Sequence, residues 1–297
     1  MTTAFSSVSS DRERVKSYYN NTNNQNSRKT LPLHIIFPWS IAYKSWWSFT
    51  VFAAAFTIFF ETFEVAFSSG GLAKSGSIIV EIILLTIFIL DIITNFNLAY
   101  YDENNKIVFN RQCIFKHYIR KMFWIDLIGV IPFYLICLQA TGTLGEESQF
   151  TQNLGLLQLL KLVRIYRVAD FFSILQYNRK ISLISLTLIR NFSAALVWTH
   201  VWACIMFFIA RESSFGQDTW LGSEEVVDMS SFENYIISLY WSVVTFTTVG
   251  YGDFSPRTSI EQIFGMIYML LNVVLMVRRC MGDGCKSVHK MCSKKSA

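Results

Sequence analysis

Apolar residues gather in long runs along this chain, and polar residues separate the runs. A helical span needs about 20 apolar residues to cross about 30 Å of hydrocarbon. Five runs meet this need, at residues 45–67, 78–100, 123–139, 154–172 and 192–210. A sixth, 263–277, is short, and starting it at Ser259 adds a turn but takes in Glu261. The pattern predicts an all-α membrane protein with six spans, of which the last (259–277) is short.

Composition supports a membrane protein. Of the 297 residues, 52% are hydrophobic and 16% charged, whereas a soluble domain carries about 25% charged residues. Residues 1–40 begin with a polar stretch that lacks the apolar core of a signal peptide, and we expect a disordered cytosolic segment there. No paired acid and base or activated nucleophile stands out, so the sequence does not favour an enzyme.

Basic residues are distributed unevenly among the loops, which predicts the orientation in the membrane. The loop between the second and third runs, the N-terminal segment and the tail at 278–297 are all rich in Lys and Arg. Residues 140–152 contain no basic residue, and the charged residues of 211–231 are five acids and one arginine. Both termini are therefore expected in the cytosol, with the acidic loop outside.

Cations recur at every third position of the fourth run, at Lys161, Arg164 and Arg167, after Gln158. Charges in hydrocarbon are costly, so such residues are rare and usually functional. In a 3₁₀ stretch, with three residues per turn, this spacing places the side chains in one straight row. The row predicts a voltage sensor, and the alternative is a basic amphipathic helix on the inner leaflet.

Acidic residues in two other runs offer partners for these cations. Asp91 and Asp126 each lie among apolar residues, where an unpaired carboxylate costs several kcal/mol. Pairing with the cations in turn would provide a sliding contact for a moving helix. Glu61 and Glu64, near the outer end of the first run, either serve the outermost cations or are simply interfacial.

The stretch 247–253 reads Thr-Thr-Val-Gly-Tyr-Gly-Asp and follows an aromatic-rich helical run at 235–246. Gly250 and Gly252 permit left-handed backbone conformations at alternate positions, so that successive carbonyls can all point one way. Four such strands around an axis would form rings of oxygens that replace the water shell of a potassium ion. The alternative is an ordinary glycine-rich turn.

Several motifs together resemble the six-span voltage-gated potassium channels of plants and algae, the plant Shaker-like group related to ether-à-go-go and hyperpolarisation-activated channels. The similar stretches are IIFPWS at 35–40, ILDIITNF at 89–96, WIDLIGVIPF at 124–133, HVWAC at 200–204, WLG at 220–222 and the region 240–256. The resemblance implies a voltage-sensor domain at 41–180 and a pore domain at 181–277.

The resemblance also implies roles for the residues of the filter. Potassium, the permeant ion, would bind at Thr248, Val249, Gly250, Tyr251 and Gly252. Thr247, Asp253 and Trp241 would support them, with Asp253 hydrogen-bonded to pore-helix side chains such as Trp241. A pore needs four chains, so we expect a homotetramer, or a heterotetramer with related subunits, in the lipid bilayer. The resemblance to the family implies that this bilayer is the plasma membrane. Neither cofactor, structural metal nor nucleic acid is implied.

Similarity to the family stops after Val277, where a basic tail at 278–297 begins. We expect a truncated product with no cyclic-nucleotide site, and therefore keep a second hypothesis, a non-conducting regulatory subunit that assembles with full-length channels. Cys280, Cys285, His289 and Cys292 match no common zinc spacing, which favours a lipid-facing tail over a zinc site. The direction of rectification is left open.

Overall fold

The structure, a computed structural model, describes residues 35–67, 75–102, 107–108, 110–134, 136–137, 155–176, 182–213, 219–221 and 229–295. Most of the segment expected to be disordered, 1–40, lies outside these ranges. The chain divides into two compact units. Unit 1 comprises residues 1–65 and 69–194, and unit 2 comprises 66–68 and 195–297.

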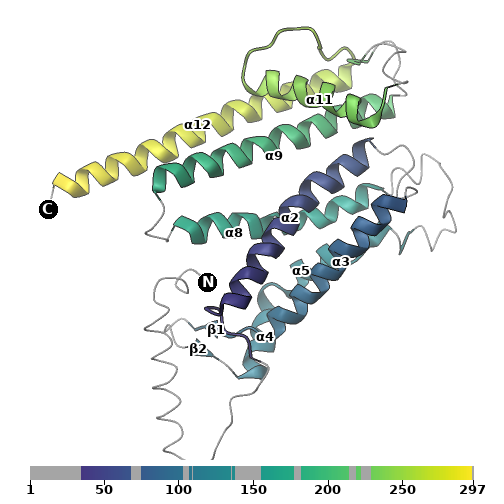
Figure 1. The fold of residues 1–297 in the computed structure, drawn as a ribbon. Coiled ribbons are helices and arrows are strands. Elements are labelled where there is room, and N and C mark those ends of the chain that lie inside the picture. Colours follow the sequence, from purple (N-terminus) through teal and green to yellow (C-terminus); the bar gives the residue numbers. More distant parts are fainter. Residues whose placement is uncertain are drawn as a thin grey trace, which may run out of the picture. The chain divides into compact units, whose positions relative to one another are not determined.

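Unit 1 is built mainly of helices (Figure 1). They are α2 (Ile41–Phe67), α3 (Ser75–Phe96), α4 (Arg111–Lys121), α5 (Phe123–Val130), the 3₁₀ helix η2 (Leu156–Arg164) and α8 (Ile165–Gln176). A small antiparallel hairpin pairs β1 (Tyr100–Tyr101) with β2 (Ile107–Val108). The backbone N–H of Ile36 donates to Asn97 O at 2.8 Å, which ties the approach to α2 to the end of α3.

A proline shortens the helix of the expected third span, 123–139. Helix α5 ends at Val130, and Ile131 is extended, with φ −63° and ψ 121°. Pro132 explains this, because a residue that precedes proline is pushed out of the helical region. Helical hydrogen bonding resumes where Ile136 N donates to Pro132 O at 3.1 Å.

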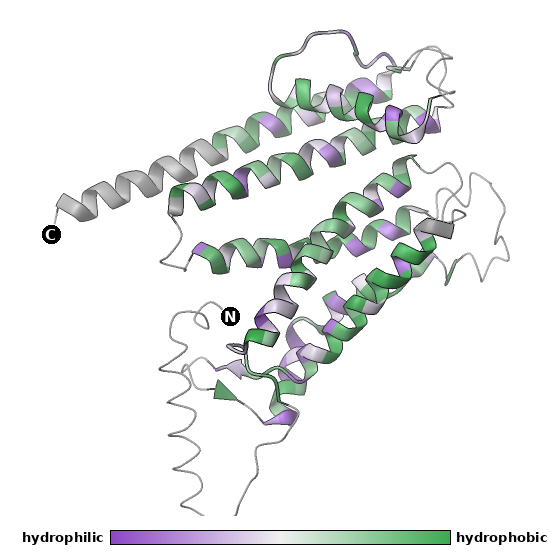
Figure 2. Ribbon diagram, in the orientation of Figure 1, coloured by the Kyte–Doolittle hydropathy of each residue, from purple (hydrophilic) through white to green (hydrophobic). Residues whose placement is uncertain are grey.

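By length and composition, four helices among the described residues are able to cross a membrane. Their apolar segments are Ile41–Phe67, Ser77–Phe96, Ile184–Glu212 and Ser259–Val277. Figure 2 shows α3 as hydrophobic over most of its length. One face of α3 contributes Leu84 and Phe88 to a core with Ala53 and Ala54, while the isoleucines of its other face are exposed. Such an exposed apolar face suits contact with lipid.

Unit 2 contains most of α9 (Leu183–Glu212), together with α11 (Ser231–Phe246) and α12 (Ser259–Lys295). Helix α11 starts four residues before the expected 235 because Ser230 and Glu233 form a capping box. Helix α9 is continuous through the expected fifth span at 192–210 and begins nine residues before it. Helix α12 continues past Val277, the expected end of the apolar run, to Lys295.

The core of unit 2 is aromatic and hydrogen-bonded. Tyr268 is fully buried, stacks on Trp202 at 4.8 Å between ring centroids, and donates to Ser242 O at 3.0 Å. The Ser242 hydroxyl donates to Thr199 O at 2.9 Å. Trp198 Nε1 donates to Asn272 Oδ1 at 2.6 Å, which links α9 to α12. These bonds hold the pore-helix candidate α11 against both long helices.

Candidate functional site

The expected cation row lies on a 3₁₀ helix that passes into an α-helix. Gln158, Lys161 and Arg164 belong to η2, where three residues per turn place them on one side. Arg167 follows in the first turn of α8. Gln158, Arg164 and Arg167 are buried within unit 1. Their burial is unlike a helix that lies on a membrane surface with its cations in water.

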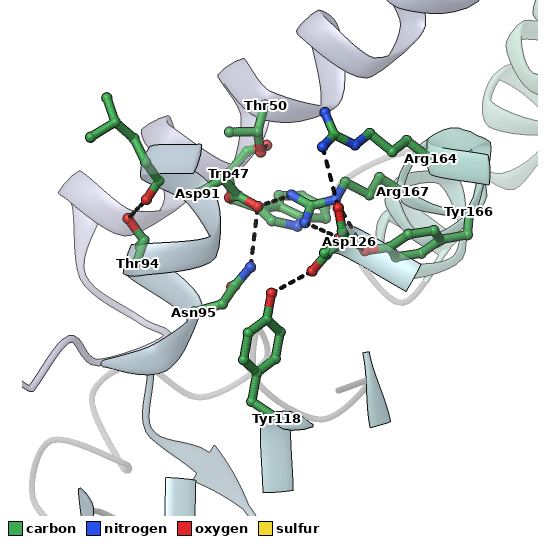
Figure 3. A network of polar contacts seen from close by, with 11 residues as sticks. Trp47, Thr50, Asp91, Thr94, Asn95, Tyr118, Asp126, Arg164, Tyr166 and Arg167 are labelled. Atoms are coloured by element: carbon green, nitrogen blue, oxygen red, sulfur yellow. Dashed lines mark hydrogen bonds and ion pairs between the residues drawn. The ribbon is translucent and has the colours of Figure 1, made fainter. Parts of the chain in front are cut away.

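Arg167 lies between Asp91 of α3 and Asp126 of α5 (Figure 3). It forms an ion pair with Asp91, and its Nη2 donates to Asp126 Oδ1 at 2.7 Å. Asn95 Nδ2 also donates to Asp91, at 3.1 Å. We call Asp91 and Asp126 the acid pair; their side chains are only 4% and 2% exposed. The structure thus brings both predicted acids to a single predicted cation.

Two tyrosines complete the shell around Asp126. The hydroxyl of Tyr118 donates to Asp126 Oδ2 and that of Tyr166 to Oδ1, both at 2.6 Å. Burial, with the neighbouring Asp126 carboxylate, raises the pKa of the Tyr118 phenol well above its ordinary value. Tyr118 therefore stays protonated and able to donate. Each oxygen of Asp126 has a donor, as a buried carboxylate requires.

Arg164 makes a different set of contacts from the one the sequence suggested. Its guanidinium carbon lies 3.4 Å from the centroid of the Phe88 ring, a cation–π arrangement. Its Nη2 donates to the backbone carbonyl of Asp126 at 3.4 Å, a long hydrogen bond. Gly129 makes room for the side chain, because a Cβ at that position would lie 2.6 Å from Arg164 Nε. Arg164 is thus held by a ring and a carbonyl.

Lys161 binds two glutamates at the other end of the row. Its Nζ lies 3.0 Å from Glu61 Oε1 and 2.6 Å from Glu81 Oε1. A cavity of about 40 Å³ adjoins this cluster. Of the two acids considered for the outermost cation, Glu61 contacts it, whereas Glu64 accepts from Ser77 Oγ at 2.9 Å.

Sequence reasoning missed several members of this network. Glu81 carries the signal that identified Asp91, an acid within an apolar run, and the same test would have found it. Phe88, Gly129 and the two tyrosines carry no such signal, because aromatic residues and glycines are common throughout these spans. Only the fold shows which of them face the cations.

The backbone of the predicted filter alternates in conformation. The φ angles of Thr248, Gly250 and Gly252 are +63°, +59° and +79°. Left-handed values are costly for residues with a Cβ, so glycine suits the second and third positions. The side chains of Val249 and Tyr251 are exposed, 53% and 72%. Left-handed backbone thus recurs at every second residue from Thr248 to Gly252.

Asp253 binds a different pore-helix residue from the one predicted. Tyr240 donates its hydroxyl to Asp253 Oδ2 at 2.7 Å, and Phe254 N donates to Oδ1 at 3.1 Å. Trp241 is buried against Trp220 and Tyr268, with ring centroids 5.7 Å and 5.9 Å away. Residues 240 and 241 are neighbours on α11 and face different directions, which the sequence alone did not distinguish.

Glu261 forms a backbone clamp beside the filter, a role the sequence did not suggest. Its carboxylate is fully buried and accepts from the N–H groups of Trp220 (3.1 Å), Arg257 (3.0 Å) and Thr258 (3.1 Å). These donors come from the segment before α11 and the segment between filter and α12. The charge that counted against a span at this position is therefore satisfied internally.

Metal-binding clusters of three or more His, Cys, Asp or Glu are not found in the described part of the chain. The side chains of the tail, with Cys280, Cys285, His289 and Cys292, fall outside that part. Unit 1 thus places buried cations beside buried acids, and unit 2 places a left-handed backbone at every second residue from Thr248 to Gly252.

Proteins of similar sequence point in the same direction. The family model for ion transport proteins matches residues 43–277. Potassium channel KAT3 of Arabidopsis thaliana is 32% identical over 237 residues, covering 78% of this chain and 35% of that protein. Potassium channel AKT2 of Oryza sativa subsp. japonica is 31% identical over 244 residues, covering 81% and 28%. Potassium channel SKOR of Arabidopsis thaliana is 29% identical over 252 residues, covering 81% and 29%. The chain thus spans about a third of the length of these relatives.

Proposed function

The chain belongs to the ion transport protein family, and we propose that it is a subunit of a voltage-gated, potassium-selective channel. Unit 1 would be the voltage sensor, and unit 2 would supply one quarter of a tetrameric pore. The observation that carries this proposal is the row of buried cations beside buried acids, in the same chain as a filter with alternating left-handed backbone.

The row is suited to sensing voltage because each cation has a counterpart in the protein. Lys161 has Glu61 and Glu81, Arg164 has Phe88 and a carbonyl, and Arg167 has the acid pair. One charge that crosses 100 mV gains about 2.3 kcal/mol. Three charges in four subunits gain at most about 28 kcal/mol per 100 mV, which is enough to switch a two-state element.

The filter would coordinate potassium through the carbonyls of residues 248–251, with the Thr248 hydroxyl and Gly252 completing the strand. Thr247, Asp253 and Trp241 would support the filter. Tyr240 would support it too, because its hydroxyl donates to Asp253. Relatives named as potassium channels support this choice of ion. We expect the tetramer, with the same or related subunits, in the plasma membrane. Both termini would be in the cytosol, because loops rich in Lys and Arg favour that side of a membrane.

Voltage clamp of cells that express this chain alone would test the proposal. We expect voltage-dependent current whose reversal potential follows the potassium gradient and not the sodium gradient. A Thr248→Cys variant that alters the potassium-to-sodium permeability ratio would connect the current with this filter. Surface-expressed chain without current, which reduces the current of a co-expressed relative, would instead support a non-conducting regulatory subunit.

A further inference from the structure

The charge row continues beyond Arg167 to a residue of opposite sign. Positions 158, 161, 164, 167 and 170 are spaced by three, and they carry Gln, Lys, Arg, Arg and Asp. Asp170 is exposed on α8, one step further toward the proposed cytosolic end than Arg167. Three cations are therefore bounded by a neutral residue on one side and by a carboxylate on the other.

Each cation of the row occupies a separate station in the structure. Lys161 is at the glutamates, Arg164 at the Phe88 ring and Arg167 at the acid pair. A movement of the helix by three residues, with the rotation that keeps the row facing the acids, would pass each residue to the next station. The occupant of the acid pair after such a step depends on the direction of movement.

An inward step keeps a cation at the acid pair. It would bring Arg164 to the acid pair, Lys161 to the Phe88 ring and Gln158 to Glu61 and Glu81. The two glutamates would lose their cation, but the amide NH₂ of Gln158 can donate hydrogen bonds to them, and no further carboxylate would approach. A second inward step would still bring a cation, Lys161, to the acid pair.

An outward step is electrostatically unfavourable. It would remove Arg167 from the acid pair and bring Asp170 toward Asp91 and Asp126. Three carboxylates would then meet where the two present ones are almost fully buried, with no cation between them. Like charges in a desolvated site repel strongly, and a buried carboxylate without a partner is costly.

We propose that Asp170 is a positioning residue that sets the outward limit of the sensor's travel, and that the sensor stands at this limit in the structure. The inference rests on the proposed function, because it assumes that the row moves in response to voltage. It adds that movement starts from the present stations and proceeds inward only. Depolarisation favours the outward position of cations, so the sensor should be fully displaced at positive voltage with Arg167 at the acid pair.

Measurement of charge movement in the full chain tests this limit without relying on conduction. Gating currents would be recorded from cells in solutions free of permeant ions, with surface expression quantified in parallel. Asp170→Arg supplies a fourth cation and allows a further outward step, so we expect an additional component at positive voltages and a larger total charge. Asp170→Asn removes the repulsion but leaves the acid pair without a cation, so its effect should be smaller and in the same direction.

The matched control is Ser173→Arg, which adds the same side chain at an exposed position of α8 but keeps Asp170. It should leave the total charge and its saturation voltage close to those of the unmodified chain. An equal increase in Ser173→Arg and Asp170→Arg, or no increase in either Asp170 variant, would overturn the inference. Absence of any charge movement from the unmodified chain at the surface would contradict the voltage-sensor proposal itself.

Discussion

Units 1 and 2 both bury carboxylates, but they satisfy them with different kinds of partner. In unit 1 the partners are side-chain cations spaced by three along η2 and α8, so that Arg164 can replace Arg167 at the acid pair. In unit 2 Glu261 is held by backbone N–H groups from separate segments, which have no equivalent replacements.

The difference shows how one chain can contain a mobile part and a stationary part. Exchangeable ion pairs keep the acid pair beside a cation at more than one position of the helix, so an inward shift does not leave these two acids without a cation. Backbone donors fix one geometry, and any shift leaves them unpaired at a cost of about 1–3 kcal/mol each. Tyr268, Ser242 and Thr199 add to the fixed geometry of unit 2.

The largest effect is expected from a change in the filter. Gly250→Val places a β-branched residue at φ +59°, which such residues strongly disfavour. We expect loss of potassium-selective current in voltage clamp, with charge movement in unit 1 retained. The control in unit 1 is Gly155→Ala, because Gly155 has an ordinary φ of −55° and its added Cβ would meet no atom within 4 Å. Normal selective current from Gly250→Val would refute the filter assignment.

Glu261→Gln should have the next largest effect, because it breaks the clamp of unit 2. An amide offers one oxygen where the carboxylate offers two, and its NH₂ group would face backbone N–H donors. We expect a loss of about 3 kcal/mol in the free energy of unfolding, seen as a lower Tm in detergent. Glu233→Gln, at the exposed cap of α11, is the control and should change Tm much less. Equal Tm shifts would mean that the clamp contributes little.

Gly129→Ala tests the position of Arg164 among the exchangeable cations of unit 1. Its Cβ would lie 2.6 Å from Arg164 Nε, so Arg164 must leave its position over Phe88. We expect an overpacking cost of about 2 kcal/mol in this position of the sensor, and a corresponding shift of the charge–voltage curve. Gly265→Ala in unit 2, with its nearest contact at 3.3 Å, serves as the control for an added methyl group. An unchanged curve in Gly129→Ala would show that Arg164 has another equally good position.

Tyr118→Phe should have the smallest effect, since it removes one of the three donors around Asp126. The loss of a hydrogen bond to a charged group is about 1.5 kcal/mol, seen as a modest shift of the charge–voltage curve. Because the pKa of Tyr118 is raised, its hydroxyl is protonated on both sides of neutrality, and the shift should be equal at pH 6 and pH 8. A shift at pH 8 that differs from the shift at pH 6 would mean that the phenol ionises between them.

Much of unit 1 could be predicted because its functional residues are charged and lie within apolar runs. Asp91, Asp126 and the cations stand out against apolar neighbours, and their pairing follows from the cost of a lone buried charge. The sequence did not predict which cation pairs with which acid, because the spacing of residues along α3 and α5 does not give the depth of each cation in the membrane. Pro132 could have predicted the early end of α5, by the conformational restriction that it imposes on Ile131.

Unit 2 was harder to predict in detail. The alternating glycines of the filter indicate its backbone, but Asp253 had two aromatic neighbours on α11 to choose between, and only the fold selects Tyr240. In the sequence Glu261 looks like a charge that weakens a span, because its partners are backbone groups, one of them far away along the chain. Backbone N–H groups are common to nearly all residue types, so the sequence does not show which of them bind Glu261. The roles of the filter residues stay predictions.

The 3₁₀ form of η2 has a mechanical consequence. Nine residues extend about 18 Å at a rise of about 2.0 Å each, but about 14 Å in an α-helix at about 1.5 Å each. A change to α-helix would thus shorten the segment by about 4 Å and unwind it by about half a turn. One end of η2 could then move along the helix axis while the other end stays in place. A change between 3₁₀ and α form in this one segment would couple a rotation about the axis to a displacement along it.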